Sequence, residues 1–238
     1  MNKTPTTQPR WLFDEFQDFG WSDASEIEAY DRLANVNPAV ENERLLELGV
    51  SKEHTLIDFG CGTGALTLEA AKLCQEVIAV DVSAAMLAYT KRKAESFGLT
   101  NIDYVQQGFL TYEHQGKPVD FVFTQHTLHH LPDFWKVQAL QRVADVLRPG
   151  GVLFARDLMF SFEPSKADHT IEAWIGNRPS DSFPRELFEH DIREEYITYT
   201  WLFEAMLKKV GFEISEVAYG EYQAYAKYIC VKRHASEE

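Results

Sequence analysis

The stretch TLIDFGCGTG, residues 55–64, decides the fold of this 238-residue chain. Residues 55–59 form a short apolar run typical of a buried strand. Gly60, Gly62 and Gly64 then occupy alternate positions before a helical pattern begins at Ala65. Glycines permit a tight turn and let a ligand approach the backbone with no Cβ in the way. The stretch therefore predicts a strand, a ligand-binding loop and a helix in succession.

An acidic residue before the glycines narrows the ligand class. Asp58 stands two positions before Gly60. Comparable loops that bind dinucleotides donate backbone N–H groups to a pyrophosphate, which a carboxylate at this point would repel. The same carboxylate would attract an ammonium group. The pattern thus favours a ligand with an amino-acid end and a sulfonium over a nicotinamide dinucleotide.

A second carboxylate, Asp81, ends the next predicted strand, residues 76–80. An acid at this distance after a glycine loop can accept hydrogen bonds from both ribose hydroxyls. Asp81-Val82-Ser83 also precedes a predicted helix, where Asp and Ser are favoured as caps. Met86 in that helix could pack on an adenine ring or belong to the core.

Strands and helices alternate along most of the remaining chain. The other strands predicted from apolar runs are residues 102–106, 119–124 and 152–156, and the helices are residues 65–73, 84–97 and 135–147. Such alternation predicts an α/β fold with a parallel sheet and helices on both faces. The strand-like runs 213–219 and 225–232 are too close for a parallel crossover, so they must form an antiparallel hairpin.

Two regions flank or interrupt this alternation. Residues 1–50 predict an N-terminal helical cap, with helices at 25–33 and 38–48 and an amphipathic helix at 11–20. The rest, 51–238, is predicted as one domain with an insertion at about 160–192 that lies over one end of the sheet. The insertion carries one predicted helix, 167–175, and a long helix, 194–210, follows it.

Composition limits the partners. The net charge of −14 and the pI of about 5.0 argue against nucleic acid, which usually requires a basic face. Three cysteines without CxxC spacing predict no disulfide framework and no metal site. The polar N-terminus and the lack of a long apolar run predict a cytoplasmic protein with no membrane partner. The sequence leaves open whether it is a monomer or a homodimer.

Four segments together carry a family resemblance: LIDFGCGTG, VIAVDVSAAML, DFVFTQHTLHHLPD and VLRPGGVL. They resemble the class I S-adenosylmethionine-dependent methyltransferases, in particular the bacterial small-molecule branch similar to ubiquinone/menaquinone-biosynthesis enzymes. The resemblance covers residues 41–158 and the C-terminal hairpin. It implies a Rossmann-like, seven-stranded, mostly parallel sheet whose last strand is antiparallel.

The resemblance also implies where S-adenosylmethionine binds. The implied cofactor-binding residues are Asp58, Gly60, Cys61, Gly62, Gly64, Asp81, Val82, Met86, Gly108, Phe109 and Gln125. The glycines would line the methionine part, Asp81 would hold the ribose, and Gln125 would lie beside the sulfonium. Many relatives carry an acid that holds the adenine amino group where Phe109 stands here. Backbone at Gly108–Phe109 or the Gln107 side chain could replace that contact.

Three histidines follow the fourth predicted strand: His126, His129 and His130. A histidine near the methyl group could act as a general base, and we take His126 as the candidate catalytic residue. The alternative is that these histidines orient the loop through hydrogen bonds. The predicted function is methyl transfer to a small-molecule acceptor, with S-adenosylhomocysteine as product. The alternative is a non-catalytic S-adenosylmethionine-binding sensor. Whether oxygen, nitrogen or carbon is methylated stays open.

Overall fold

The computed structural model describes residues 9–16, 24–177 and 183–234. In chain order its main elements are α1 (Ala24–Ala34), α2 (Pro38–Glu47), β1 (Thr55–Phe59), α3 (Ala65–Leu73), β2 (Glu76–Asp81), α4 (Ala84–Ser96), β3 (Ile102–Gln106), β4 (Val119–Gln125), α5 (Asp133–Val146), β5 (Leu147–Phe160), α6 (Ala167–Gly176), α7 (Arg185–Glu194), β6 (Thr198–Tyr199), α8 (Thr200–Lys209), β7 (Phe212–Tyr219) and β8 (Tyr225–Lys232). Short 3-10 turns lie at Leu128–His130, Pro164–Lys166 and Glu221–Gln223.

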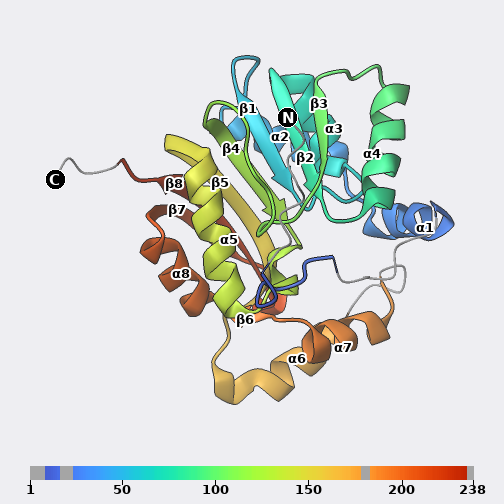
Figure 1. Cartoon of the computed structure of the whole chain (residues 1–238). Helices are drawn as coiled ribbons and strands as arrows, with labels where there is room; N and C mark the ends of the chain where they lie inside the picture. The colour runs from blue at the N-terminus through green and yellow to red at the C-terminus, as the bar shows by residue number, and fades with distance from the viewer. Residues whose placement is uncertain (1–8, 17–23, 178–182, 235–238) are drawn as a thin grey trace.

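One twisted sheet organises the molecule, and its strand order is β3-β2-β1-β4-β5-β8-β7 (Figure 1). Strands β1 to β5 pair in parallel, and β8 runs antiparallel to both β5 and β7. The Rossmann-like α/β fold, the hairpin and the antiparallel last strand are thereby confirmed. The two-residue β6, which pairs with the end of β5, adds an eighth strand to the seven that were predicted.

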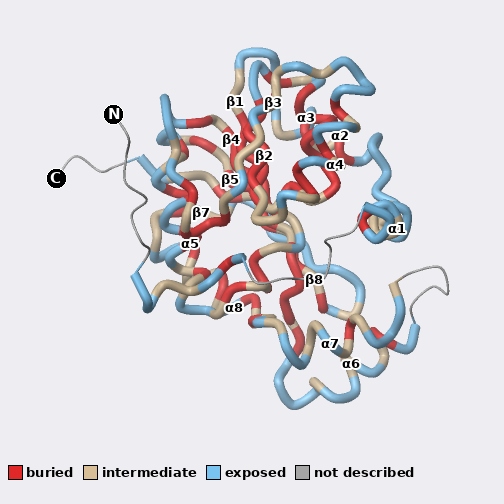
Figure 2. The backbone as a smooth tube through the Cα atoms, turned by 45° about the vertical axis from the view of Figure 1, so that its right-hand side comes forward, coloured by how far each residue is buried: buried red, intermediate tan, exposed pale blue. Residues whose placement is uncertain are grey.

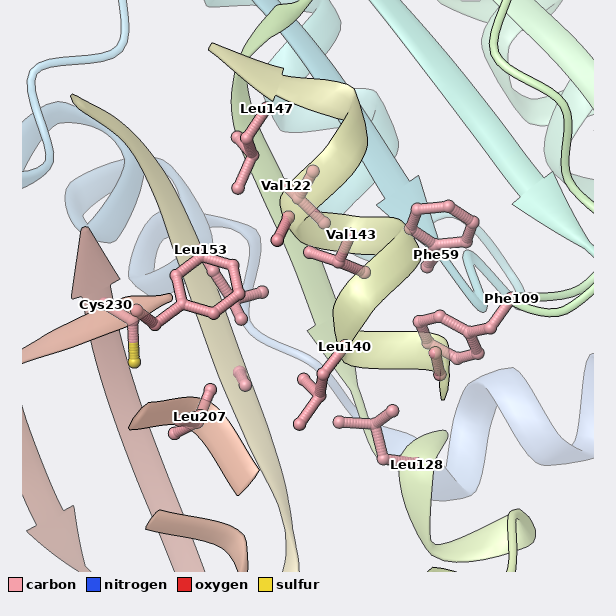
Figure 3. Close-up of a cluster of buried hydrophobic side chains, with 14 of the residues drawn as sticks. Phe59, Phe109, Val122, Leu128, Leu140, Val143, Leu147, Leu153, Leu207 and Cys230 are labelled. Atoms are coloured by element: carbon pink, nitrogen blue, oxygen red, sulfur yellow. The ribbon is translucent and has the colours of Figure 1, made fainter. Parts of the chain in front are cut away.

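The central strands are apolar along their whole length because both faces are covered. On one face, α5 and α8 contribute Leu140, Val143 and Leu207 to a cluster with residues such as Val122 and Leu153 (Figure 3). On the other face, α2 and α3 pack on β1, β2, β4 and β5 in a second cluster. The buried residues accordingly follow the strands through the centre of the molecule (Figure 2). This core fixes the carboxyl ends of β1 to β4 at one edge.

The region after β5 differs from the prediction in two ways. Helix α7 was not predicted, and the predicted long helix over 194–210 is wrong in its first part, because only Thr200–Lys209 is helical. The chain leaves α7 at Glu194 and runs extended through Thr198–Tyr199, which pair with Met159 and Phe160, before α8 begins. The intervening YITY run is β-branched and aromatic, and such residues favour extended backbone at a sheet edge.

The boundary between α5 and β5 also differs. The predicted strand 152–156 is the middle of a longer strand that starts at Leu147 and ends at Phe160. It includes Pro149 and Gly150, which lie between the predicted helix 135–147 and the predicted strand. A register shift between Val119 and Phe121 of β4 accommodates this irregular start.

Residues 9–16 form turns, so the helix predicted over 11–20 is wrong for the part that the structure describes. Phe19 and Gly20 of that predicted helix lie outside the described residues, and so does Arg178 of the insertion. Aromatic side chains of residues 9–16 pack on distant parts of the chain. Trp11 stacks on Trp135 with ring centroids 6.2 Å apart, and Phe13 meets Tyr196 edge-on. Helix α1 packs on α4 and α2 packs on α3. Among the described helices, none is long and apolar enough to cross a membrane.

The chain between β5 and β6 forms a third apolar cluster of its own. Phe160 and Phe162 at the end of β5 pack with Trp174 of α6 and Phe188 of α7. These two helices lie beyond the carboxyl end of β5, away from the layers that cover the sheet (Figure 1).

Candidate functional site

A cavity of about 510 Å³ opens where β1, β2, β3 and β4 end. Of the predicted cofactor residues, its wall includes Gly60, Gly62, Asp81, Val82, Met86, Gly108, Phe109 and Gln125. His126 and His130 also line it, as do Tyr30 of α1 and, from the N-terminal segment, Phe13, Glu15 and Phe16. Its volume lies in the range of small-molecule and cofactor sites.

Three of the predicted residues lie outside this wall: Asp58, Cys61 and Gly64. The Asp58 carboxylate is buried behind the glycine loop and accepts a 2.6 Å hydrogen bond from the Thr67 hydroxyl. Burial raises the pKa of Asp58 to about 7, and the hydroxyl of Thr67 opposes that rise. A direct role for Asp58 toward an ammonium group stays a prediction.

The glycine loop has a physical reason for each of its glycines. All three have positive φ: 72° at Gly60, 50° at Gly62 and 80° at Gly64. A Cβ on Gly60 would lie 2.3 Å from Thr127 Oγ1, and one on Gly64 would lie 2.4 Å from Thr90 Cγ2. A Cβ on Gly62 would meet nothing within 4 Å. Gly60 and Gly64 therefore allow close packing, whereas Gly62 presents bare backbone to the cavity.

Asp81, at the end of β2, connects the glycine loop to the start of α4. Its carboxylate accepts the N–H of Gly62 and the N–H of Ser83, both at 2.8 Å. Burial raises the pKa of Asp81, and these two donors oppose the rise. The alternative reading of Asp81-Val82-Ser83 as a helix cap holds for Ser83, which is the N-cap of α4 and whose Oγ accepts the N–H of Met86. Its carboxylate forms part of the cavity wall.

The end of β4 is held from helix α2. Arg44 donates to the side-chain oxygen of Gln125 at 3.3 Å, and the Gln125 amide donates to Glu41 at 3.3 Å. Arg44 and Glu41 are themselves an ion pair. These contacts fix the orientation of the amide in the cavity wall.

His126 lies at the turn that follows β4, with a φ of 53°. Its N–H donates to the carbonyl of Arg156 at 2.9 Å, and its ring meets Tyr225 edge-on at 5.6 Å. The surrounding protein desolvates the imidazole and lowers the pKa of His126 to about 4, although the ring faces the open cavity. His126 is therefore neutral at physiological pH.

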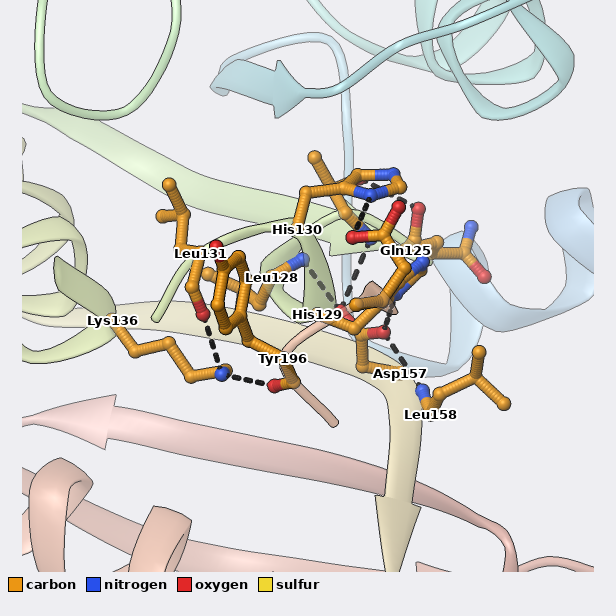
Figure 4. A network of polar contacts seen from close by, with 11 residues as sticks. Gln125, Leu128, His129, His130, Leu131, Lys136, Asp157, Leu158 and Tyr196 are labelled. Carbon is orange, nitrogen blue, oxygen red and sulfur yellow. Dashed lines mark hydrogen bonds and ion pairs between the residues drawn. The ribbon is translucent and has the colours of Figure 1, made fainter. Parts of the chain in front are cut away.

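His129 has a different environment, shown in Figure 4. Its Nδ1 lies 2.5 Å from Asp157, which also accepts the N–H groups of Thr127 and Leu128. Burial disfavours both charges, yet the imidazolium holds the pKa of Asp157 well below its usual range, and Asp157 raises the pKa of His129. The pair thus organises the loop after β4, as the alternative reading of these histidines proposed.

His130 faces the cavity, and its Nδ1 lies 3.0 Å from a carboxylate oxygen of Glu195, just after α7. Lys136 of α5 donates to the carbonyls of Leu131 and Tyr196, which ties the loop after β4 to the segment that leads into β6 (Figure 4). Within the described residues, no group of three His, Cys, Asp or Glu side chains could hold a metal ion.

Sequence reasoning missed Glu15. Its carboxylate is buried in the cavity wall and accepts the N–H of Leu110. The signal was weak because Glu15 lies in a short acidic segment and its partner is 95 residues away.

The cavity suits one class of ligand. A half-buried carboxylate at Asp81 can accept from a diol, bare backbone at Gly62 admits close approach, and Met86 and Phe109 offer apolar surface. A nucleoside joined to an amino acid has these complementary parts. The fold and this cavity together define a Rossmann-like enzyme that binds S-adenosylmethionine.

Comparison with known proteins assigns the family. Residues 56–151, from β1 to the start of β5, match the family described as methyltransferase domain. The chain is 27% identical over 159 residues to an uncharacterized methyltransferase of Oceanobacillus iheyensis, covering 66% of this chain and 71% of that protein. It is 31% identical over 135 residues to the ubiquinone/menaquinone biosynthesis C-methyltransferase of Pseudoalteromonas translucida, covering 55% and 51%.

A solved S-adenosylmethionine-dependent methyltransferase from Clostridium acetobutylicum shares the fold, with a TM-score of 0.68 and 16% identity. The match covers 88% of this chain and 98% of that one. Residues 56–151 thus match a methyltransferase domain, the fold is that of the class I S-adenosylmethionine-dependent methyltransferases, and the cofactor is S-adenosylmethionine.

Proposed function

We propose that this methyltransferase acts on a small-molecule acceptor that enters the cavity at the carboxyl edge of the sheet. The observation that carries the proposal is the cavity itself. One space of about 510 Å³ is lined by the glycine loop, the Asp81 carboxylate and the end of β4. This space suits a cofactor and a compact acceptor rather than a polymer. The net charge of −14 also disfavours nucleic acid as acceptor. The relative named for ubiquinone/menaquinone biosynthesis supports the same conclusion.

Within this proposal, different residues of the cavity wall bind different parts of the cofactor. Asp81 holds the ribose hydroxyls, and Val82 and Met86 lie along one side of the base. Gly108 and Phe109 lie at the other side. The methionine part follows the backbone at Gly60 and Gly62, and Gln125 stands near the sulfonium. The cofactor supplies a methyl group already activated on positively charged sulfur.

The protein's task is then alignment and exclusion of water. Holding the reacting groups in line contributes several kcal/mol to such a transfer. The amide of Gln125 is fixed by Arg44 and Glu41, so it can orient a ligand without first becoming ordered. His126 faces the cavity, so its imidazole can accept a proton from an acceptor that enters protonated, although its lowered pKa makes it a weak base.

Two measurements test the proposal. Isothermal titration calorimetry with S-adenosylhomocysteine tests whether the cavity is the cofactor site: Gly62→Val, which places a branched side chain in it, should abolish binding while the circular dichroism spectrum is kept. Release of S-adenosylhomocysteine from S-adenosylmethionine, measured across a panel of small phenols, amines, quinols and carboxylic acids, tests the acceptor. Cofactor binding without turnover on any of them, together with turnover on a protein or nucleic acid, would contradict the small-molecule assignment.

A further inference from the structure

The N-terminal segment brings a carboxylate into the cavity wall. Glu15 is 7% exposed. Both of its oxygens lie 2.9 Å from the N–H of Leu110, and Oε2 accepts from the Thr111 hydroxyl at 3.3 Å. Phe13, two residues earlier, packs against Trp135 and Tyr196. The segment is thus docked by both apolar and polar contacts, and Glu15 is held on the loop that follows β3.

The absence of a side chain at Gly108 leaves the space that the Glu15 carboxylate occupies. A Cβ on Gly108 would lie 2.5 Å from Glu15 Oε1 and 2.6 Å from Glu15 Cδ. The backbone at Gly108 does not have a left-handed φ, so its conformation would admit other residues. The carboxylate of Glu15 therefore occupies the space that a side chain at position 108 would fill. A side chain at position 108 would therefore displace the carboxylate of Glu15, whereas the turn itself would tolerate one.

Among the described residues, none forms an ion pair with the Glu15 carboxylate. Its hydrogen-bond partners are the N–H groups of Leu110 and Phe109 and the hydroxyl of Thr111, and Arg142 acts on it only through space. Burial raises the pKa of Glu15 above its usual value, and these donors oppose the rise. Two carboxylate oxygens can accept about four hydrogen bonds in total, so capacity remains for a donor in the cavity. A neutral N–H donor on a ligand suits this place.

We propose that Glu15 accepts a hydrogen bond from the exocyclic amino group of the cofactor's adenine, and so selects the base. The inference rests on the proposed placement of the cofactor, in which the base lies beside Gly108 and Phe109. The sequence analysis offered the backbone at Gly108–Phe109 or the Gln107 side chain for this contact, whereas the proposal assigns it to a carboxylate from the N-terminal segment. That segment is thereby part of the binding site.

A ligand pair tests the contact directly. The first ligand is S-adenosylhomocysteine, and the second is its purine analogue, in which hydrogen replaces the amino group. Calorimetry on the intact chain should show the amino compound binding about 10-fold or more tightly, the contribution of a hydrogen bond to a charged acceptor. Glu15→Gln and Glu15→Ala should remove most of this preference by weakening the amino compound alone. Asp14→Asn, an exposed acid in the same segment, serves as the matched control and should keep the preference.

A relocated carboxylate gives the second test. Gly108→Asp alone should weaken binding, because its Cβ overlaps Glu15. The same change combined with Glu15→Ala should restore the preference for the amino compound, since the new side chain extends into the vacated space. The ratio of the dissociation constants of the two ligands does not depend on the fraction of the protein that is folded. If the Glu15 variants lost affinity for both ligands equally, the inference would be overturned. If the wild-type protein bound neither ligand, the placement of the cofactor itself would be overturned.

Discussion

Replacement of Asp81 by Asn is the sharpest test of the cofactor site. The change keeps the shape of the side chain but removes its charge and one of its two acceptor oxygens. In the free protein those oxygens accept the N–H of Gly62 and the N–H of Ser83 at 2.8 Å. The remaining amide oxygen can serve only one of them, and the amide nitrogen must face the other donor.

The expected loss of affinity follows from these contacts. A hydrogen bond from a hydroxyl to a charged acceptor contributes about 1.5–3 kcal/mol. The proposal gives Asp81 two ribose hydroxyls, and Asn can still accept from one, so we expect a loss of about 2–3 kcal/mol. This corresponds to binding of S-adenosylhomocysteine that is weaker by about 30- to 150-fold.

Calorimetry with S-adenosylhomocysteine measures this loss, and Asp103→Asn provides the control. Asp103 is an exposed acid on β3, so its replacement removes the same charge without touching the cavity. Urea unfolding of both variants shows how much of the change belongs to the free protein. If Asp81→Asn bound the ligand as tightly as the wild-type protein, the ribose assignment would be refuted.

Three further expectations concern the scaffold of the site and can be checked by urea unfolding. Gly60→Ala should lower the free energy of unfolding by about 2 kcal/mol or more, because its φ is left-handed and its Cβ would overlap Thr127; an unchanged midpoint would contradict this packing. Asp58 has a folded pKa of about 7, above its value in the unfolded chain, so the folded state binds more protons between these values. The contribution of Asp58 to the free energy of unfolding should therefore fall as pH rises from about 4 to about 7, and Asp58→Asn should remove that slope. Asp157→Asn should cost about 3–5 kcal/mol at pH 7, since it leaves a buried His129 without its charged partner; a loss below 1 kcal/mol would show that the pair does not organise the loop.

The sequence was sufficient for elements whose signals are local. Residues 55–59 and 65–73 were predicted to the residue because an apolar run, glycines and a helical pattern follow one another directly. The hairpin was predicted because two strand-like runs separated by a few residues have only one way to pair. The position of Asp81 near the glycine loop could also be predicted, because the carboxyl ends of parallel strands lie at one edge of the sheet.

The parts that were missed depend on contacts between distant segments. The aromatic residues of 11–16 have helical spacing, but Trp11 and Phe13 both pack on Trp135, far away in the sequence, so spacing misled the prediction. Helix α7 begins after Pro184, in the predicted insertion, for which only the helix 167–175 was predicted. Glu15 contacts Leu110 across 95 residues, and no local pattern encodes such a pair.

The position of β8 also bears on how the chain reaches this structure. This strand comes after all the others in the described sequence, yet it lies inside the sheet, between β5 and β7. Until residues 225–232 are available, β5 has a free edge of unpaired backbone and apolar side chains, which is a template for aggregation. Closing that edge requires a pairing far from local in sequence, and such pairings form slowly. A nascent chain stalled or cleaved before β8 would therefore be a target for chaperones and proteases, whatever the state of its glycine loop.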